Sequence, residues 1–498
     1  MVETATKSLS ELGLTARGGR DVRITGLTVD SREVKDGFLF AALPGTRVHG
    51  ATFIQYALRM GAAAILTDAA GARIAQAEID ASDAALVIAA DPRQALAFTA
   101  ALWFGVQPET VVAVTGTNGK TSVATFTRQL WQELGVRAIN LGTTGIEGDW
   151  QAPLAHTTPE PVTLHGALAE AARAGVSHVA MEASSHGLDQ RRLDGVTLKA
   201  AAFTNFTQDH LDYHASFEDY FAAKAGLFVR VLSEDGTVVV NIDDPRGVDI
   251  LAMAKARGQD VITVGREAAD LCLERQRFDA TGQDLRLSYR GTVRQERLNL
   301  IGGFQAENVL IAAGLVIACG ADADDVFDMI PLLETVRGRM QLAATRENGA
   351  AVFVDYAHTP DAVATAAQAL RPHVMGRLVV IVGAGGDRDA GKRPLMGRAA
   401  AQAADMVIVT DDNPRSEDPA AIRAAVMAGA REASETVTEV GDRAEAILRG
   451  VDALGPGDAL LICGKGHETG QIVGDTVYPF DDAEQASVAV AALDGKGL

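Results

Sequence analysis

The chain has 498 residues, and its 45 Lys and Arg against 65 Asp and Glu give a formal net charge of −20. At about 100–200 residues per domain, this length predicts about three domains. The composition, 47% hydrophobic and 22% charged, is that of a globular protein with an ample core. The negative net charge argues against non-specific electrostatic binding to nucleic acid or to an anionic membrane, although it is compatible with a local basic pocket.

Cysteine usage and hydropathy indicate the compartment. Cys272, Cys319 and Cys463 lie far apart and form no CxxC pair, which favours a reducing environment. The N-terminus lacks a basic segment followed by an apolar one, so no signal peptide is visible. The longest apolar stretch, residues 309–321, is shorter than the roughly 20 residues of a spanning helix and predicts a buried core helix instead. We expect a cytoplasmic monomer without membrane insertion.

The pattern of apolar runs and of alternating strand-like and helix-like segments predicts an α/β protein in three parts. Residues 1–92 contain short apolar runs and predict a small mixed α/β domain. Residues 93–337 begin with a helix over 93–103 and then alternate strands with helices, which favours a parallel sheet covered on both faces. Residues 338–498 repeat that alternation and predict a Rossmann-like, doubly wound domain. Ligands of such sheets bind beyond the carboxyl ends of the strands, so the loops there are the first candidates for a site.

The sharpest motif is VVAVTGTNGKTS, residues 111–122, in which an apolar strand enters a Gly-rich turn and then a helix. Backbone N–H groups at such a helix start bind phosphate oxygens, Lys120 would neutralise the β- and γ-phosphates, and the Thr121 hydroxyl suits Mg²⁺. The motif departs from the general GxxxxGK[ST] pattern, because Val114 stands where the first glycine belongs. A glycine turn that merely caps a helix is the competing interpretation. The loop by itself predicts nucleotide binding and no more.

Downstream residues have the chemistry of a metal shell. Glu182 ends an apolar strand, where a carboxylate reaches a metal held by a phosphate loop, although an ordinary strand-end carboxylate is the alternative. The segment TNFTQDHLDYH, residues 204–214, is dense in possible ligands that include His210.

A lysine falls within an apolar helix face. Phe217, Phe221, Lys224 and Phe228 are spaced four, three and four residues apart, which places them on one side of a helix. Either the lysine extends its head group to water, or desolvation leaves a nucleophilic amine that takes up CO₂ as a Mg²⁺-binding carbamate. Helix spacing does not decide between these two interpretations.

Together these motifs resemble the Mur ligases. The resemblance rests on TGTNGKTS, NFTQDHLDYH, AAKAGLF, DYAHTPD at 355–361 and DNPRSEDP at 412–419, and it runs from about residue 30 to residue 468. It implies an N-terminal UDP-sugar-binding domain, a central ATP-binding domain and a C-terminal amino-acid-binding domain. It also implies an ATP-dependent amide ligase of peptidoglycan precursor synthesis, with Mg²⁺ as cofactor and a UDP-N-acetylmuramoyl dipeptide as substrate.

The resemblance also assigns the catalytic and nucleotide-binding residues. Lys120, Lys224, His210 and Glu182 are implied as catalytic, with Lys224 carbamylated as N6-carboxylysine. Thr121, Glu182, His210 and the Lys224 carbamate are implied as metal ligands. The implied ATP contacts are Gly116, Thr117, Asn118, Gly119, Lys120, Thr121, Ser122, Asn308, Arg339 and Asp355. Gln305 stands where the family pattern GxFNxxN usually has Asn, which puts only the contact geometry there in doubt.

Two substrate sites follow from the same resemblance. The implied contacts of the UDP-sugar dipeptide are Leu27, Ser31, His49, Gly50, Thr157, Thr158, Ser184, Gln190 and Arg192. The implied contacts of the amino-acid acceptor are Arg388, Asp412, Asn413, Pro414, Arg415, Gly464 and Glu468.

The acceptor is expected to be meso-2,6-diaminopimelate, joined to the D-Glu γ-carboxylate through an acyl phosphate. Arg415 offers a planar pair of donors to the distal carboxylate that lysine lacks, and in the family the DNPR motif accompanies diaminopimelate. L-Lysine as acceptor is the nearest alternative. A folate polyglutamate ligase and a phosphate-loop switch without ligase chemistry are more distant ones.

Overall fold

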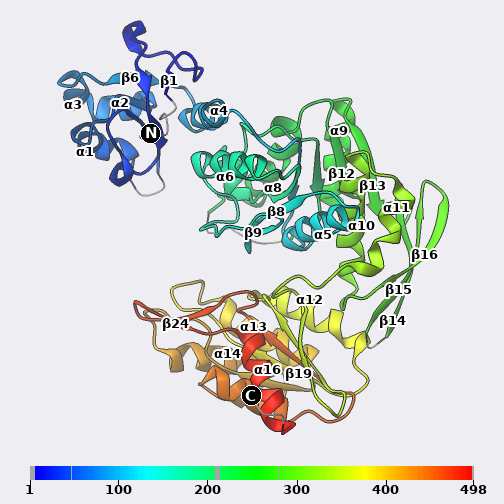
Figure 1. Cartoon of the computed structure of the whole chain (residues 1–498). Coiled ribbons are helices and arrows are strands. Elements are labelled where there is room, and N and C mark those ends of the chain that lie inside the picture. Colours follow the sequence, from blue (N-terminus) through cyan, green and yellow to red (C-terminus); the bar gives the residue numbers. More distant parts are fainter. Residues whose placement is uncertain (1–5, 46–47, 208–212, 280, 496–498) are drawn as a thin grey trace. The chain divides into compact units, whose positions relative to one another are not determined.

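The computed structural model describes residues 6–45, 48–207, 213–279 and 281–495. The chain divides into two compact units, residues 1–265 with 311–326 and residues 266–310 with 327–498. The first unit contains an N-terminal and a central sheet, and the second contains the C-terminal sheet (Figure 1). The predicted α/β fold class with three sheet-based parts is therefore confirmed, while the domain boundaries at residues 92 and 337 stay predictions.

The N-terminal sheet is parallel, with strand order β3-β4-β5-β6. Phe40, Ile65 and Leu86 pack with the apolar residues of α1, α2 and α3, whereas the alternate residues on the same strands pack against α4. Period-two alternation thus gives this sheet two buried faces. The elements are β1 (Lys7–Ser8), η1 (Arg17–Gly19), β2 (Arg23–Ile24), β3 (Gly26–Thr28), η2 (Ser31–Glu33), β4 (Phe38–Ala41), η3 (Gly50–Phe53), α1 (Ile54–Arg59), β5 (Ala64–Thr67), α2 (Ala69–Ile74), α3 (Gln76–Asp80), β6 (Ala85–Ile88) and α4 (Pro92–Phe104).

The boundaries of α4 follow from local chemistry. The Asp91 side chain accepts from the Gln94 backbone N–H at 3.1 Å, and Pro92 takes the first helical position, where no N–H is needed. Gly105, with φ of 71°, ends the helix in the left-handed conformation. The helix predicted over 93–103 is confirmed and is one residue longer at each end.

The central sheet has strand order β13-β12-β11-β7-β10-β8-β9, and only β9 runs antiparallel to its neighbour. One face packs against α6, α7 and α8, and α5 packs against β7, β8 and β10. The elements are β7 (Thr110–Thr115), α5 (Lys120–Glu133), β8 (Ala138–Gly142), β9 (Gly145–Gly148), α6 (Pro161–Arg173), β10 (His178–Glu182), α7 (Ser185–Asp189), β11 (Ala200–Phe203), α8 (Phe217–Gly226), the π-helical turn η4 (Leu227–Val231), β12 (Thr237–Asn241), α9 (Pro245–Ala256) and β13 (Asp260–Gly265).

The second unit begins with an antiparallel ribbon that the sequence analysis did not predict. Strands β14 (Leu271–Asp279), β15 (Gly282–Tyr289) and β16 (Thr292–Leu298) pair in order, and β15 carries most of the buried residues. Helices α10 (Phe304–Ala318) and α11 (Ala323–Asp328) follow, of which residues 311–326 belong to the first unit, and then η5 (Ile330–Leu332). The apolar run predicted to be a buried helix lies mostly within α10, and its residues from Val309 to Val316 are all buried.

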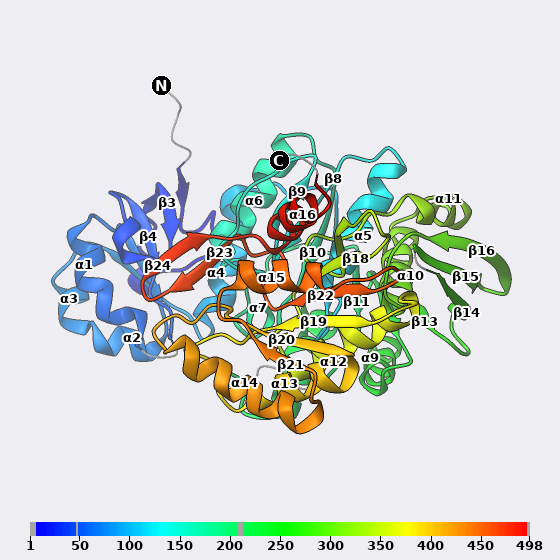
Figure 2. The same ribbon diagram turned by 90° about the horizontal axis from the view of Figure 1, so that it is seen from below.

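The C-terminal sheet has strand order β17-β18-β22-β19-β20-β21, and all but the edge strand β17 are parallel. Figure 2 shows α12, α13 and α14 on one face and α15 and α16 on the other, which matches the two apolar clusters. The elements are β17 (Gln341–Thr345), β18 (Ala351–Asp355), α12 (Pro360–Leu370), η6 (Arg371–His373), β19 (Leu378–Val382), α13 (Lys392–Ala403), β20 (Met406–Val409), α14 (Pro419–Ala433), β21 (Val437–Glu439), α15 (Arg443–Asp452), β22 (Ala459–Cys463), the hairpin β23 (Gly470–Val473) and β24 (Thr476–Pro479), and α16 (Asp482–Leu493).

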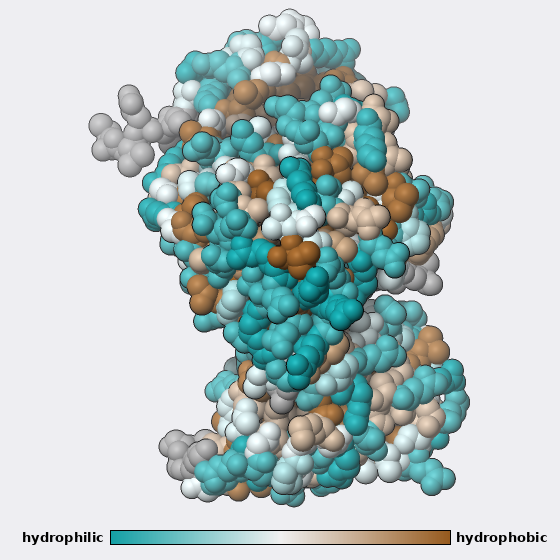
Figure 3. Space-filling view, turned by 90° about the vertical axis from the view of Figure 1, so that its right-hand side faces the viewer, coloured by the Kyte–Doolittle hydropathy of each residue, from teal (hydrophilic) through white to brown (hydrophobic). Residues whose placement is uncertain are grey.

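The surface agrees with the composition. On the face drawn in Figure 3, hydrophilic residues predominate and hydrophobic ones are scattered among them. Within the part of the chain that the structure describes, no helix combines the length and the apolar character needed to cross a membrane.

Candidate active site

The phosphate loop leaves the carboxyl end of β7, which lies between β10 and β11 in the sheet. Gly116 has φ of 150°, and a Cβ there would lie 1.9 Å from Thr204 Oγ1, so only glycine fits. Helix α5 starts directly afterwards at Lys120, with Gly119 as its N-cap. The loop therefore has the strand–glycine turn–helix order that binds phosphate at a helix N-terminus.

Two lysines meet at one carbonyl of this loop. Lys224 Nζ donates to Gly116 O at 2.7 Å, and Lys120 Nζ donates to the same oxygen at 2.9 Å and to Thr117 O at 2.7 Å. Lys224 is only 1% exposed, and its Nζ lies 4.4 Å from the centroid of the Tyr220 ring. The interpretation that Lys224 extends to water is therefore wrong. The structure brings this lysine to the phosphate loop.

The apolar helix face around Lys224 is only partly as predicted. Phe221 and Phe228 are buried, but Phe217 is 39% exposed. Phe217 is the first residue of α8 and lies at the start of the helix, whereas Phe228 lies beyond the end of α8, in the π-helical turn η4.

Glu182 ends β10 and is 2% exposed. Its Oε1 accepts from the Thr143 backbone N–H at 2.8 Å, and its Oε2 accepts from the Thr143 hydroxyl at 3.2 Å. Parallel pairing sets Glu182 opposite Val114, two residues before the glycine turn. Thr143 was not predicted as a site residue, although its position just after β8, beside β10, could have indicated it.

The predicted metal ligands suit Mg²⁺ in chemistry. The described residues contain no group of three His, Cys, Asp or Glu side chains that would hold a metal. Of the predicted metal ligands that the structure describes, only Glu182 is a residue of these four types. Thr121 would contribute a hydroxyl and Lys224 a carbamate. Mg²⁺ prefers hard oxygen donors, so the carbamate fits while the ammonium form of Lys224 does not. His210 lies outside the described residues.

The predicted contacts of the nucleotide-sugar peptide in the central part form one network. The Thr158 hydroxyl donates to Glu182 O at 2.9 Å and accepts from the Ser184 backbone N–H at 3.0 Å. Arg192 donates to Thr158 O and to Gln190 Oε1. Thr157 shares a hydroxyl–hydroxyl bond with Thr143, the partner of Glu182. The structure thus joins Thr157, Thr158, Ser184, Gln190 and Arg192 around the end of β10.

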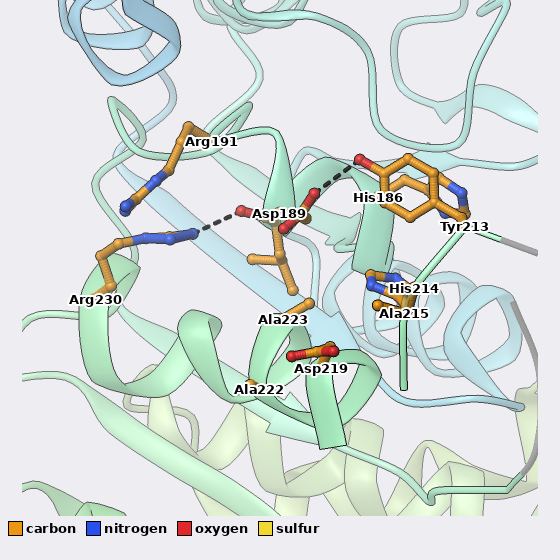
Figure 4. Close-up of a pocket in the computed structure, with 11 residues that line it drawn as sticks. His186, Asp189, Arg191, Tyr213, His214, Ala215, Asp219, Ala222, Ala223 and Arg230 are labelled. Atoms are coloured by element: carbon orange, nitrogen blue, oxygen red, sulfur yellow. Dashed lines mark hydrogen bonds between the residues drawn. The ribbon is translucent and has the colours of Figure 1, made fainter. Parts of the chain in front are cut away.

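A cavity of about 1150 Å³ opens beside this network (Figure 4). Gln190 Nε2 donates to the Tyr213 hydroxyl, which in turn donates to Asp189 Oδ2 at 2.7 Å. Tyr213 therefore links a predicted substrate residue to the cavity wall. The lining residues are His186, Leu188, Asp189, Arg191, Tyr213, His214, Ala215, Asp219, Ala222, Ala223 and Arg230.

The N-terminal candidates lie at the carboxyl edge of their sheet. Leu27 is in β3, Ser31 follows β3, and His49 and Gly50 follow β4. His49 Nδ1 accepts from the Ala51 N–H at 3.0 Å, so its proton is on Nε2, which faces Asp68 Oδ1 at 3.2 Å. The ring is thereby fixed in one tautomer and orientation.

The remaining nucleotide candidates are in the second unit. Asn308 Nδ2 donates to Gln305 Oε1 at 3.1 Å within α10, so the glutamine that departs from the family pattern orients Asn308, one of the predicted ATP contacts. Asp355 is buried and accepts from the Met340 N–H at 2.7 Å. Burial raises the pKa of Asp355, and the neighbouring charge of Arg339 opposes that rise.

The acceptor candidates are gathered at the carboxyl edge of the C-terminal sheet. Asn413 Nδ2 donates to Glu468 Oε2 at 2.9 Å, and a Cβ on Gly464 would lie 2.4 Å from Asp412 Oδ2. Arg415 Nη1 donates to Gly386 O at 2.9 Å. Gly386 lies in the loop after β19, which also contains the exposed Arg388. The loops after β19, β20 and β22 therefore come together as predicted, with Pro414 between Asn413 and Arg415.

Models of the Mur ligase family match most of the chain. The family's catalytic domain matches residues 23–103, its middle domain residues 114–316 and its glutamate ligase domain residues 338–466. The chain belongs to the Mur ligase family, and it is an ATP-dependent enzyme that forms amide bonds.

The names of similar proteins specify a reaction more narrowly than the family models do. The chain is similar to UDP-N-acetylmuramoyl-L-alanyl-D-glutamate–2,6-diaminopimelate ligases of Bradyrhizobium diazoefficiens, at 48% identity over 95% of this chain and 96% of that one, and of Caulobacter vibrioides, at 47% over 98% and 100%. A solved structure of a ligase with the same name has 32% identity and a TM-score of 0.71, and the match covers 98% of this chain and 99% of that one.

Proposed function

We propose that this ligase couples meso-2,6-diaminopimelate to the D-Glu γ-carboxylate of UDP-N-acetylmuramoyl-L-Ala-D-Glu, with ATP converted to ADP and phosphate. It would act as a cytoplasmic monomer in peptidoglycan precursor synthesis. Near-full-length similarity to ligases so named supports the reaction. The choice of acceptor rests on the loop of residues 412–415. This loop places the Arg415 guanidinium at the same sheet edge as the hydrogen-bonded pair Asn413 and Glu468.

The proposed reaction has two steps. A γ-carboxylate oxygen of D-Glu attacks the γ-phosphorus of ATP, and ADP leaves to give an acyl phosphate. The neutral amine of the acceptor then attacks the acyl carbon, loses a proton and expels phosphate, which is a far better leaving group than hydroxide. Both steps need positive charge beside the phosphoryl oxygens and exclusion of water.

The chain's own groups suit these requirements. Lys120, the first N–H groups of α5 and Arg339 would hold the phosphates. Asn308 would hold the adenine and Asp355 the ribose. Glu182, Thr121, His210 and the Lys224 carbamate would hold Mg²⁺, which supplies positive charge to the phosphoryl oxygens. Support for carbamylation comes from the shared carbonyl of Gly116, because two ammonium groups on one oxygen repel each other and a carbamate replaces one cation by an anion.

Acceptor selection would depend on Arg415. A guanidinium binds a carboxylate through two parallel hydrogen bonds, and lysine would leave that group without its carboxylate partner. Asp412, Asn413, Gly464 and Glu468 offer oxygens to the ammonium groups of the acceptor, and Arg388 offers a second cation.

The experiment is to incubate the enzyme with ATP, Mg²⁺, the UDP-muramoyl dipeptide and either amino acid, and to identify products by mass spectrometry. We expect the diaminopimelate amide, ADP and phosphate, much slower turnover with lysine, and none without Mg²⁺. Faster turnover with lysine would reject the acceptor. ATP hydrolysis without a new amide would indicate a phosphate-loop switch, and activity only on folate polyglutamates would reject the substrate.

A further inference from the structure

Lys465 is a buried cation to which the reaction described above gives no role. It lies in the loop after β22, between the acceptor candidates Gly464 and Glu468, and its side chain is 0% exposed. Burying an ammonium group is costly unless it is paired and hydrogen-bonded. Its partners therefore indicate what the group is for.

Those partners are two acceptor candidates. Lys465 Nζ donates to Asn413 Oδ1 at 3.0 Å and to Glu468 Oε2 at 3.2 Å. Asn413 Oδ1 also accepts from the Ile472 N–H at 2.9 Å, in the first strand of the hairpin β23–β24. With two donors on its oxygen, the Asn413 amide has only one orientation, and its Nδ2 must face Glu468.

The consequence falls on the two oxygens of Glu468. Oε2 receives both Asn413 Nδ2, at 2.9 Å, and Lys465 Nζ, whereas no described residue donates a hydrogen bond to Oε1. The Glu468 side chain is 33% exposed, so it is the partly open member of an otherwise buried triad. The triad fixes one carboxylate oxygen and leaves the other for an incoming donor.

We propose that Lys465 is a positioning residue that orients Asn413 and Glu468 so that Glu468 Oε1 accepts an ammonium group of the amino-acid substrate. This inference rests on the proposed function. Of the two amino groups of diaminopimelate or lysine, one reacts as the neutral amine and the other stays an ammonium. A carboxylate with a fixed direction recognises that second group, and Lys465 balances its charge while the pocket is empty.

The test is Lys465→Met, which removes the ammonium group and keeps a long unbranched side chain. Loss of a charge-assisted hydrogen bond predicts a rise of about tenfold or more in the KM of the amino acid. Because the ATP and nucleotide-sugar contacts are other residues, kcat and the KM values of those substrates should change less than about twofold. Glu468→Gln should raise the same KM, and the double variant should be no worse than Glu468→Gln alone.

Arg346→Met is the matched control. Arg346 is another cation of the C-terminal part, with a side chain that is 14% exposed and paired with Asp494 at 3.0 Å, but it lies next to the amino end of β18. The Arg346→Met substitution should lower the melting temperature of the protein and leave the KM for the amino acid unchanged. If Lys465→Met does not fold, Lys465→Gln keeps a donor without the charge, and a smaller rise in the amino-acid KM is expected, with the other two KM values again unchanged.

Equal changes in all three KM values, an unchanged amino-acid KM, or additive effects with Glu468→Gln would overturn the inference. A wild-type enzyme that prefers lysine would instead reject only the acceptor proposed above, and the Lys465 variants would then be assayed with lysine.

Discussion

The carbonyl of Gly116 is where two side chains from different helices meet. Lys120 comes from the start of α5 and Lys224 from α8, and both ammonium groups donate to this one oxygen. Like charges at that distance repel each other, and burial of Lys224 strengthens the effect by removing water. Carbamylation of Lys224 would relieve the repulsion.

Lys224→Ala should therefore lower turnover by a factor of about 100 or more, the usual cost of removing one electrostatic contact from a phosphoryl-transfer site. Short carboxylates such as acetate should restore part of it by replacing the carbamate oxygens. Steady-state phosphate release measures both effects. Lys255→Ala, an exposed lysine in α9, should behave like the wild type. Full activity in the Lys224 variant would exclude the carbamate role.

Arg415→Met should raise the KM for diaminopimelate by about tenfold or more, since two charge-assisted hydrogen bonds to a carboxylate are lost. Lysine, which has no distal carboxylate, should be used no worse than before, so the preference between the two acceptors narrows. Competition between them in one reaction measures this ratio directly. Arg398→Met is the control, because Arg398 is a partly exposed arginine in α13 that pairs with Glu432. Equal losses with both acceptors would contradict the assignment of Arg415.

At the scale of an element, α6 contains a histidine that the reaction does not need. His165 is 3% exposed, and its Nε2 has no hydrogen-bond partner among the described residues. Burial lowers the pKa of His165 from 6.5 to about 4. The folded protein therefore holds this ring neutral, whereas the unfolded chain takes up a proton below about pH 6.5.

Stability should consequently be complete above pH 6.5 and fall as the pH drops from 6.5 towards 4. The His165 contribution to this loss is about 2 kcal/mol between pH 7 and pH 5. The unfolding free energy, measured by urea unfolding at several pH values in this range, should depend less steeply on pH for His165→Leu than for the wild type. The exposed His156 provides the comparison, because His156→Leu should keep the wild-type slope. Identical slopes for all three proteins would mean that His165 is not the group responsible.

At the scale of the whole molecule, the candidate residues are divided between the two units. The phosphate loop, Glu182 and Lys224 are in the first unit, while Asn308, Arg339, Asp355 and the acceptor loops are in the second. If one ATP uses both sets, catalysis requires the two units to close on the substrates and exclude water.

Small-angle X-ray scattering tests this closure. A non-hydrolysable ATP analogue, the UDP-muramoyl dipeptide and Mg²⁺ together should reduce the radius of gyration. The dipeptide alone should have a smaller effect, because its predicted contacts are all in the first unit. A scattering profile that does not change with any ligand would argue against closure.

Much of the fold followed from local patterns. The run VVAV at 111–114 is apolar at every position because both faces of a parallel strand are buried, and it lies within β7, as predicted. The run LVVIV of β19 has the same character. The β14–β16 ribbon was missed because charged residues interrupt its period-two pattern, as in LCLERQRFD. Its pairing depends on neighbouring strands rather than on any one of them.

The sequence by itself determined the Gly-Lys-Thr loop, the strand ends that carry Glu182 and Asp412, and, through resemblance, the family. These depend on residues that are close in the chain. Only the tertiary structure decided that Lys224 meets the carbonyl of Gly116, 108 residues away, that Thr143 holds Glu182, and that Lys465 leaves one oxygen of Glu468 open. Such contacts depend on which strands become neighbours and on which polar groups burial forces into pairs, and the order of residues along the chain specifies neither.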